Sequence, residues 1–470
     1  MFAAIIILIV VFLGLLAFSS YFNLLRFLLI WLPLQTMICM IIFSYTGSAD
    51  IVKPFLALKE ICLLLSFFCV IFNWNKISFI ACDYFAVLSI IYVSIYALIP
   101  DSFLGVECSI ESRLYGFRSA IIPFLLYFLG RFSNFNEHQV LKIFKFQFGV
   151  ALLVSLFGFF EYSVPWEFWR DNLLYQEFRE MQAVGVSQGV FDGGVKQYFY
   201  TAFSGSELRR LVSTFSSPLH VAFYLAFPII FLISLYLTKL KLIFKENFYS
   251  FLIFLIFLFA FILTFSRGPF ISLALSIIVL VFNFGANSRK LKTILYSIFF
   301  ISILVVFFYS DITNIVSSTV SLSDPSSQGH FAAYEKAFDV IPEHPLGIGL
   351  GQSGSVGAAF GNGGGLGESL YFTILSEQGY LGFIIFVFFV SNLLFHLKRK
   401  TIFTSHDFNV SLLRHLNISI FSLTFFYIFA SMNTEQWRGF TMSGFYWLFL
   451  GFLLTLNSNR NRGMPIEKLT

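Results

Sequence analysis

Long apolar runs recur along the whole chain, separated by short polar connections and by two long polar segments. A helix needs about 17 to 25 apolar residues to cross the roughly 30 Å of hydrocarbon in a bilayer. About thirteen runs approach or reach this length, and we take the range as twelve to fourteen. Because lipid cannot satisfy the hydrogen bonds of an open backbone, each run is predicted to be a helix. The pattern therefore predicts an all-α polytopic membrane protein, with residues 1–470 forming one integral membrane domain.

The expected spans follow the apolar runs, with approximate bounds at 2–18, 22–45, 55–72, 77–98, 117–130, 144–162, 219–238, 250–265, 269–284, 293–309, 370–397, 412–430 and 440–456. The run at 117–130 is short enough to fit a re-entrant segment as well as a span. The first run has no basic stretch before it and no clear cleavage site after it, so we interpret it as a retained span.

The composition supports a lipid environment, since 58% of the 470 residues are apolar, 12% are charged and the mean hydropathy is +0.82. A soluble protein of this length could not bury so much apolar surface. The net charge of +5 is modest and no basic block resembles a nucleic-acid-binding tract. The histidines and cysteines form no HExxH or CxxC pattern, so we expect neither a metal site nor a cofactor.

The distribution of lysine and arginine predicts which connections face the cytoplasm, because short cytoplasmic loops are rich in both. One alternate set of connections is basic, as at Lys398, Arg399 and Lys400. The other set contains the two long segments, 163–218 and 310–368, which we therefore place outside as periplasmic loops. An odd number of spans then puts the N-terminus outside and the C-terminus inside.

A few arginines stand on the outer side, against this trend, each at the edge of a span. They are Arg118, Arg209, Arg210, Arg267 and Arg438. Each alone could extend along the helix toward lipid phosphate, as long cationic side chains do at membrane surfaces. Their gathering on one face indicates instead a site for an anionic ligand.

The second outer segment carries most of the polar chemistry. Phe331, Tyr334 and Phe338 repeat at helical spacing, which predicts an amphipathic helix that ends near Val340, before two prolines. The stretch 347–367 is rich in glycine, so we expect a loose backbone that can approach a ligand. Glu368 follows in the first turn of the next span, where a carboxylate is either an N-terminal cap or a general base.

Four stretches of the chain resemble the O-antigen ligase and polymerase superfamily, often called Wzy-like. They are Tyr115 to Arg118 with Pro123; Arg210 to Pro218; Thr264 to Gly268; and Pro345 to Gly351 continuing through Glu368 to Tyr371 and Glu377 to Gly382. The resemblance implies a metal-independent glycosyltransferase with a GT-C-like fold in the bacterial inner membrane. It also implies an undecaprenyl-pyrophosphate-linked glycan as donor, used on the periplasmic face.

The resemblance also suggests residue roles. Arg210 and Arg267 match the arginines of the family best, which implies that they hold the pyrophosphate. Ligases of the superfamily carry a histidine where this chain has Glu368, so the difference favours a polymerase and makes Glu368 the candidate base. His330, near a position where the family often has an arginine, is the alternative. The substrate-binding set is completed by Arg118, Arg209, Arg438, Tyr334 and Tyr371.

Two rival functions fit the same sequence features. A ligase would transfer the glycan to lipid A core by the same chemistry, and a flippase or transporter would use the arginines to line a transport cavity. The expected partners are lipid-linked oligosaccharide repeat units and membrane lipid, together with a chain-length regulator and a flippase of the same pathway. The long outer loops favour an enzyme, because a transporter must present its site to both faces.

Overall fold

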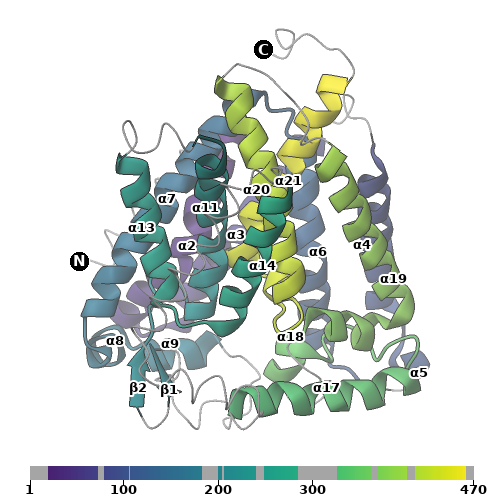
Figure 1. The fold of residues 1–470 in the computed structure, drawn as a ribbon. Coiled ribbons are helices and arrows are strands. Elements are labelled where there is room, and N and C mark those ends of the chain that lie inside the picture. Colours follow the sequence, from purple (N-terminus) through teal and green to yellow (C-terminus); the bar gives the residue numbers. More distant parts are fainter. Residues whose placement is uncertain are drawn as a thin grey trace.

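The computed structural model describes residues 20–71, 79–104, 106–182, 199–203, 206–239, 248–283, 325–360, 369–399 and 408–461. Long helices run between two ends of the molecule, and short helices and a small hairpin gather at one of these ends (Figure 1). We call this the loop end. The fold is therefore a bundle of long helices with a structured layer over one end.

The long helices coincide with eleven of the predicted apolar runs. They are α2 (Tyr21–Thr46), α3 (Ala49–Ile71), α4 (Ala81–Leu98), α6 (Ile110–Phe132), α7 (Glu137–Ser163), α11 (Pro218–Lys239), α13 (Phe248–Ile262), α14 (Arg267–Asn283), α19 (Leu370–Arg399), α20 (Phe408–Ala430) and α21 (Phe440–Asn461). The predicted spans at 2–18 and 293–309 lie outside the described residues. Among the described helices, seven are long and apolar enough to cross a membrane, and α13 and α14 are shorter apolar helices. The chain is thus an all-α membrane protein, and the total of thirteen spans stays a prediction.

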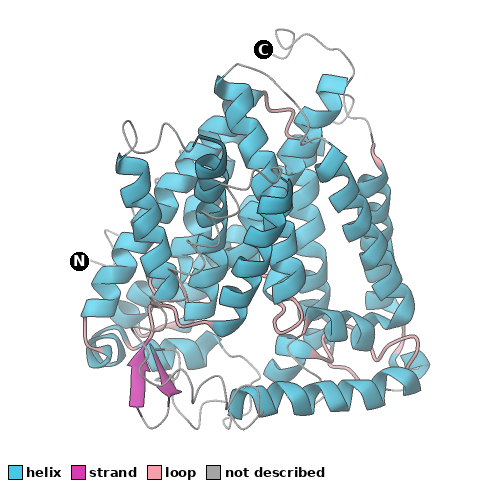
Figure 2. Ribbon diagram, viewed as in Figure 1, coloured by secondary structure: helices cyan, strands magenta, loops and turns pink. Residues whose placement is uncertain are grey.

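The layer at the loop end comes mainly from the two long polar segments. It consists of α5 (Asp101–Leu104), α8 (Trp166–Leu173), α9 (Tyr175–Gln182), the antiparallel strands β1 (Tyr200–Phe203) and β2 (Ser206–Arg209), α17 (Pro325–Glu343), α18 (Gly354–Ala359) and the 3-10 helix η3 (Gln436–Arg438). Figure 2 shows the hairpin as the strand element of the described structure, among helices and loops. Both long segments therefore contribute to the same end of the bundle.

Two sequence expectations are corrected at this end. The run at 117–130 is part of α6, which has 23 residues and begins at Ile110, so it is not a short re-entrant segment. Its first turns carry Glu111 and Arg113, which hid the start of the helix from an apolar pattern. The helix expected to stop before Pro342 instead runs to Glu343, and includes this proline in its last turn.

Close helix packing sets the core of the bundle. α6 packs against α21, α4 against α19, and α14 against α20. Where α6 and α21 cross, Gly130 and Gly451 face each other, and a Cβ atom at Gly451 would lie 2.7 Å from the Cα atom of Gly130. Only hydrogen at these positions allows the two backbones to approach so closely.

A fully buried ion pair lies beside this crossing, between α4 and α6. Arg131 donates to Asp83 through Nε (2.9 Å) and Nη2 (2.7 Å), and the Tyr127 hydroxyl donates to the same carboxylate (2.5 Å). Arg131 Nη1 also donates to Thr455 Oγ1 on α21 at 3.0 Å. The network joins three helices at the end of the bundle opposite the loop end, and so fixes how α4, α6 and α21 pack.

Candidate functional site

Arg209 is anchored at the end of α7 by a buried carboxylate. Glu161, whose side chain is 1% exposed, accepts from Arg209 Nη2 at 2.7 Å. Its second oxygen accepts from the backbone N–H groups of Val212 and Ser213 at 2.9 and 3.0 Å. These three donors offset the free-energy cost of burying the charge of Glu161. Glu161 therefore holds the segment after β2 against the last turn of α7.

Arg210 is held by the turn between α13 and α14. Its Nε donates to the Thr264 carbonyl at 3.0 Å, and its Nη2 donates to Ser266 Oγ at 3.1 Å. The backbone N–H of Leu211 donates to the Leu263 carbonyl at 2.8 Å. Arg267, the first residue of α14, follows this turn directly. The structure thus brings Arg209, Arg210 and Arg267 into one group, which we call the arginine cluster.

The charge of the arginine cluster favours an anion. Arg209 pairs with Glu161, and Arg210 donates to the Thr264 carbonyl and to the Ser266 hydroxyl. Arg267 stands at the N-terminus of a 17-residue helix, where the backbone N–H groups and the helix dipole add positive potential. Both Arg210 and Arg267 are partly exposed at the loop end. The cluster therefore combines guanidinium groups and a helix N-terminus.

A second charged group surrounds a kink in α19. Gly379 has φ 68° and ψ −172°, which breaks the helix one turn after Ser376. Just before the kink, Glu377 accepts from the backbone N–H of Gly351 at 2.8 Å and pairs with Arg438 Nη2 at 3.4 Å. The Glu377 side chain is 1% exposed and that of Arg438 is 10% exposed. Arg438 therefore pairs with a residue of α19 and is not part of the arginine cluster.

The glycine-rich stretch is firmly anchored where the structure describes it. Positive φ angles occur at Gly347, Gly349, Gly351 and Gly354, so the chain winds in a way that other residues disfavour. The Ser112 hydroxyl of α6 donates to the Gly351 carbonyl at 2.5 Å. The expectation of a loose backbone is wrong for residues 347–354, because this loop is fixed between α6 and the kink of α19.

The connection between α20 and α21, residues 431–439, joins several elements of the loop end. Glu435 accepts from Thr373 Oγ1 at 2.6 Å and from Ser355 Oγ at 3.2 Å. Tyr334 of α17 donates to the Met432 carbonyl at 2.7 Å. Burial raises the pKa of the Glu435 carboxyl, and the positive charge of Arg438 opposes this effect. We call this group the α20–α21 connection.

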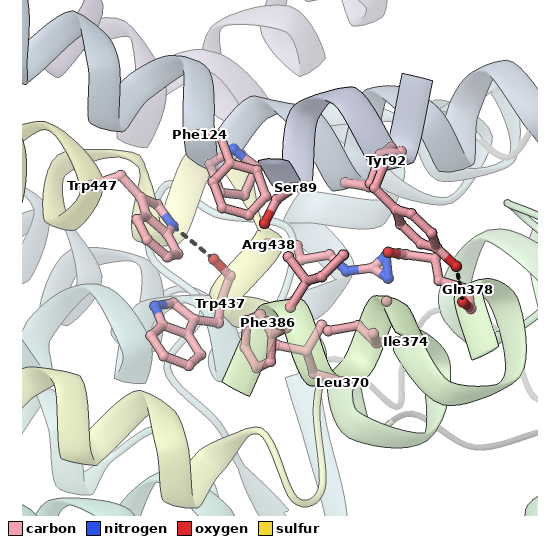
Figure 3. A pocket seen from close by; sticks show the side chains of 15 residues that line it. Ser89, Tyr92, Phe124, Leu370, Ile374, Gln378, Phe386, Trp437, Arg438 and Trp447 are labelled. Carbon is pink, nitrogen blue, oxygen red and sulfur yellow. Dashed lines mark hydrogen bonds between the residues drawn. The ribbon is translucent and has the colours of Figure 1, made fainter. Parts of the chain in front are cut away.

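An apolar pocket lies on the bundle side of Arg438, with about 520 Å³ of empty space, open solvent included. Figure 3 shows Trp437, Trp447, Phe124 and Phe386 among the side chains around it. Arg438 is the charged residue among the described residues that line the pocket, and within this part of the chain its Nε is buried without a hydrogen-bond partner. The pocket suits hydrocarbon better than a free polar molecule.

The other predicted site residues, Arg118, Tyr371, Glu368 and His330, belong neither to the arginine cluster nor to the group around the kink of α19. Arg118 pairs with Glu60 of α3, with its guanidinium 5.8 Å from the centre of the Tyr115 ring. Tyr371 donates to the Ile428 carbonyl at 2.7 Å, which joins α19 to α20. Glu368 lies outside the described residues. His330 lies in α17, and its side chain is likewise outside the description.

Sequence reasoning gave no role to three carboxylates that organise the site, although Glu377 lies in a stretch that carries the family resemblance. Glu161 and Glu377 each lie inside or at the end of an apolar run, where a charged residue is costly and usually has a partner. The presence of a charged residue in an apolar run would have identified both Glu161 and Glu377 as residues with a buried partner. Glu435 stands in a short connection with nothing unusual around it in the sequence. In the described part of the chain, no group of three or more His, Cys, Asp or Glu residues could hold a metal ion.

The apolar helices and their charged loop end define a multi-pass membrane protein. Residues 252–387 match a family model described as O-Antigen ligase, a stretch that includes Arg267, α17 and the kink of α19. The match confirms the resemblance to the O-antigen polymerase and ligase superfamily, and it does not separate polymerase from ligase. It supports a glycosyltransferase-like role in surface polysaccharide assembly. No curated protein matches the chain.

Proposed function

We propose that this protein is a surface polysaccharide polymerase of the bacterial inner membrane, metal-independent and with a GT-C-like fold. It transfers a glycan from undecaprenyl pyrophosphate to a lipid-linked repeat unit on the periplasmic face. The observation that carries the proposal is the arginine cluster, in which Arg210 is tied to the turn that leads into Arg267 at the start of α14.

The reaction exchanges one glycosidic bond for another. A hydroxyl oxygen of the acceptor sugar attacks the anomeric carbon of the donor glycan and forms the new C–O bond. The bond between the anomeric carbon and the pyrophosphate oxygen breaks, and undecaprenyl pyrophosphate leaves with the electron pair. The proton of the acceptor hydroxyl passes to a base, so charge and atoms balance. The difficult part is the negative charge that develops on the leaving group.

Arg210 and Arg267 stabilise this developing charge. Guanidinium stays protonated and binds two oxygens at once, so it matches a pyrophosphate well. Donors fixed before the reaction need no reorganisation when the charge develops, and the contacts of Arg210 with Thr264 and Ser266 provide this fixation. We assign Arg118, Arg209 and Arg438, each of which pairs with a carboxylate, to orienting the glycan.

The acceptor side involves the start of α19. Glu368, two residues before this helix, positions or deprotonates the acceptor hydroxyl, with His330 as the alternative group. Tyr334 and Tyr371 provide rings near this end, and each hydroxyl is already held by a backbone carbonyl. We therefore assign the two tyrosines to contact with the sugar rings rather than to proton transfer.

The test is chain growth by purified protein in detergent, given lipid-linked repeat units, with products resolved as a ladder. Arg210→Ala and Arg267→Ala should each slow ladder formation by about 10²–10³-fold, the usual effect of removing one such donor. Arg170→Ala is the matched control, because Arg170 is exposed at the same end and pairs with its neighbour Asp171. Full ladder formation by Arg210→Ala and Arg267→Ala would show that the assigned role is wrong.

A ligase is the second candidate, favoured by the printed description of the matching family model. Deletion of the gene separates the two functions. A polymerase predicts that long chains disappear while single repeat units are still attached to the lipid A core. A ligase predicts that all attachment to the core is lost. If all attachment is lost, the protein is a ligase and not a polymerase, and the role proposed for the arginine cluster is unchanged.

A further inference from the structure

Glu435 lies beside the start of α19, where the acceptor is proposed to bind. The backbone N–H of Leu370 and the hydroxyl of Ser369 both donate to the Ser431 carbonyl, at 3.0 and 3.1 Å. Four residues further along the same connection, Glu435 accepts from Thr373 in the first turn of α19 at 2.6 Å. The carboxylate therefore lies within about one helical turn of the start of α19.

The protein backbone is shaped to admit this carboxylate. A Cβ atom at Gly354 would overlap the Glu435 carboxylate, so only glycine fits there with the observed φ of 63°. Ser355, the next residue, donates to Glu435 Oε2 and is itself exposed. One carboxylate oxygen thus faces α19 and the other faces an exposed hydroxyl at the loop end.

Glu435 and Glu377 have different surroundings although both lie near Arg438. Glu377 is sealed from solvent and accepts from two backbone N–H groups, those of Gly351 and Ser353, besides its pair with Arg438. Glu435 accepts from the hydroxyls of Thr373 and Ser355 and from the Ser355 backbone N–H, and the residue is partly exposed. Of the two carboxylates, Glu435 is therefore the one with access to solvent, on the side of Ser355.

We propose that Glu435 is the base that takes the proton of the acceptor hydroxyl, which leaves Glu368 the positioning role. This inference rests on the proposed function. As the acceptor oxygen bonds to the anomeric carbon and undecaprenyl pyrophosphate departs, the hydroxyl proton moves to the Glu435 carboxylate. The carboxylic acid then returns the proton to water on the side of Ser355.

The charged groups around Glu435 predict how the rate depends on pH. Arg438 of η3 and Glu377 of α19 face it with opposite charges, α18 contributes no charged residue, and Tyr334 of α17 contacts the same connection. Glu435 must be deprotonated to act as a base, so the rate rises with pH through its pKa. Burial raises the pKa of Glu435, so this rise lies above the range of an exposed glutamate.

The experiment measures initial rates of ladder formation against pH for wild type and variants. Glu435→Gln should lower the rate by about 10²–10⁴-fold and remove the rise with pH, because the amide keeps the shape and loses the base. Ser355→Ala should keep the rise and shift it to higher pH, since it removes a donor to the charged form. A role in folding alone would not shift the pH profile.

Glu368→Gln is the comparison that separates the two carboxylates. This variant should have a higher KM for the acceptor and should keep the rise of the rate with pH. If Glu435→Gln keeps that rise, or Glu368→Gln loses it, Glu435 is not the base, while slow ladders from Arg210→Ala still support the proposed function. If wild type forms no ladder, the proposed function fails first. Should Glu435→Gln fail to fold, an unshifted profile for Ser355→Ala overturns the inference.

Discussion

Replacing Asp83 by alanine should destabilise the bundle strongly. Asp83 is 2% exposed and Arg131 is fully buried, and the carboxylate accepts from Arg131 twice, from the Tyr127 hydroxyl and from the Ile80 N–H. Asp83→Ala leaves the Arg131 charge in the bundle without this counter-ion. Breaking a buried ion pair by removing one partner costs about 3–5 kcal/mol. This is a large part of the roughly 5–15 kcal/mol that stabilises a typical folded protein.

The assay is equilibrium unfolding of the purified protein in mixed detergent micelles, with a denaturing detergent as the variable. Tyr127→Phe removes one hydrogen bond to the charged group and should cost about 1.5–3 kcal/mol, less than Asp83→Ala. Asp50→Ala is the matched control, because Asp50 forms an exposed pair with Lys53 on α3 and should change stability little. If Asp83→Ala unfolds at the same midpoint as Asp50→Ala, the network does not hold α4, α6 and α21 together.

Two further predictions concern the loop end. Gly351→Ala should destabilise the protein, because the new Cβ atom would lie 2.6 Å from the carbonyl carbon of Ser112 and φ at this position is 77°. Gly149→Ala is the comparison: Gly149 faces open space on α7, so this change should stabilise the protein by about 0.5–1 kcal/mol. Equal melting temperatures for the two variants would contradict the prediction. The pKa of Glu435 is raised in the folded protein, so its contribution to stability is present at low pH and is lost as pH rises through that pKa. As pH rises, the melting temperature of wild type should therefore fall relative to that of Glu435→Gln. If the two melting temperatures change with pH in parallel, the pKa of Glu435 is not raised in the folded protein.

The positions of the helices were predictable because lipid sets both their length and their apolar composition. The run at 219–238 became α11 (Pro218–Lys239), and the run at 440–456 became α21 (Phe440–Asn461). Errors arose where polar residues belong to a helix. The first two turns of α6 carry Ser112 and Arg113, whose partners come from the glycine-rich loop and from Asp101. An apolar pattern cannot include residues that are polar because another segment covers them.

The site was only half predictable, for a physical reason. Arginines on the wrong side of the topological trend drew attention to Arg210 and Arg267, and the structure places both at the same turn. Their partners were not predictable, because Glu161 meets Arg209 across 48 residues and Glu377 meets Arg438 across 61. A kink at Gly379 lies two residues after Glu377, and the loop of positive φ angles donates to the same carboxylate. Such long-range pairing depends on tertiary packing, which local pattern does not encode.

Density for undecaprenyl pyrophosphate bound to the purified protein, obtained by cryo-electron microscopy, would test the central claim most directly. Our account predicts that the two phosphates lie against the guanidinium groups of Arg210 and Arg267 at the start of α14, with N–O distances of about 2.7–2.9 Å. A pyrophosphate bound elsewhere on the loop end, with both side chains turned away from it, would contradict the account.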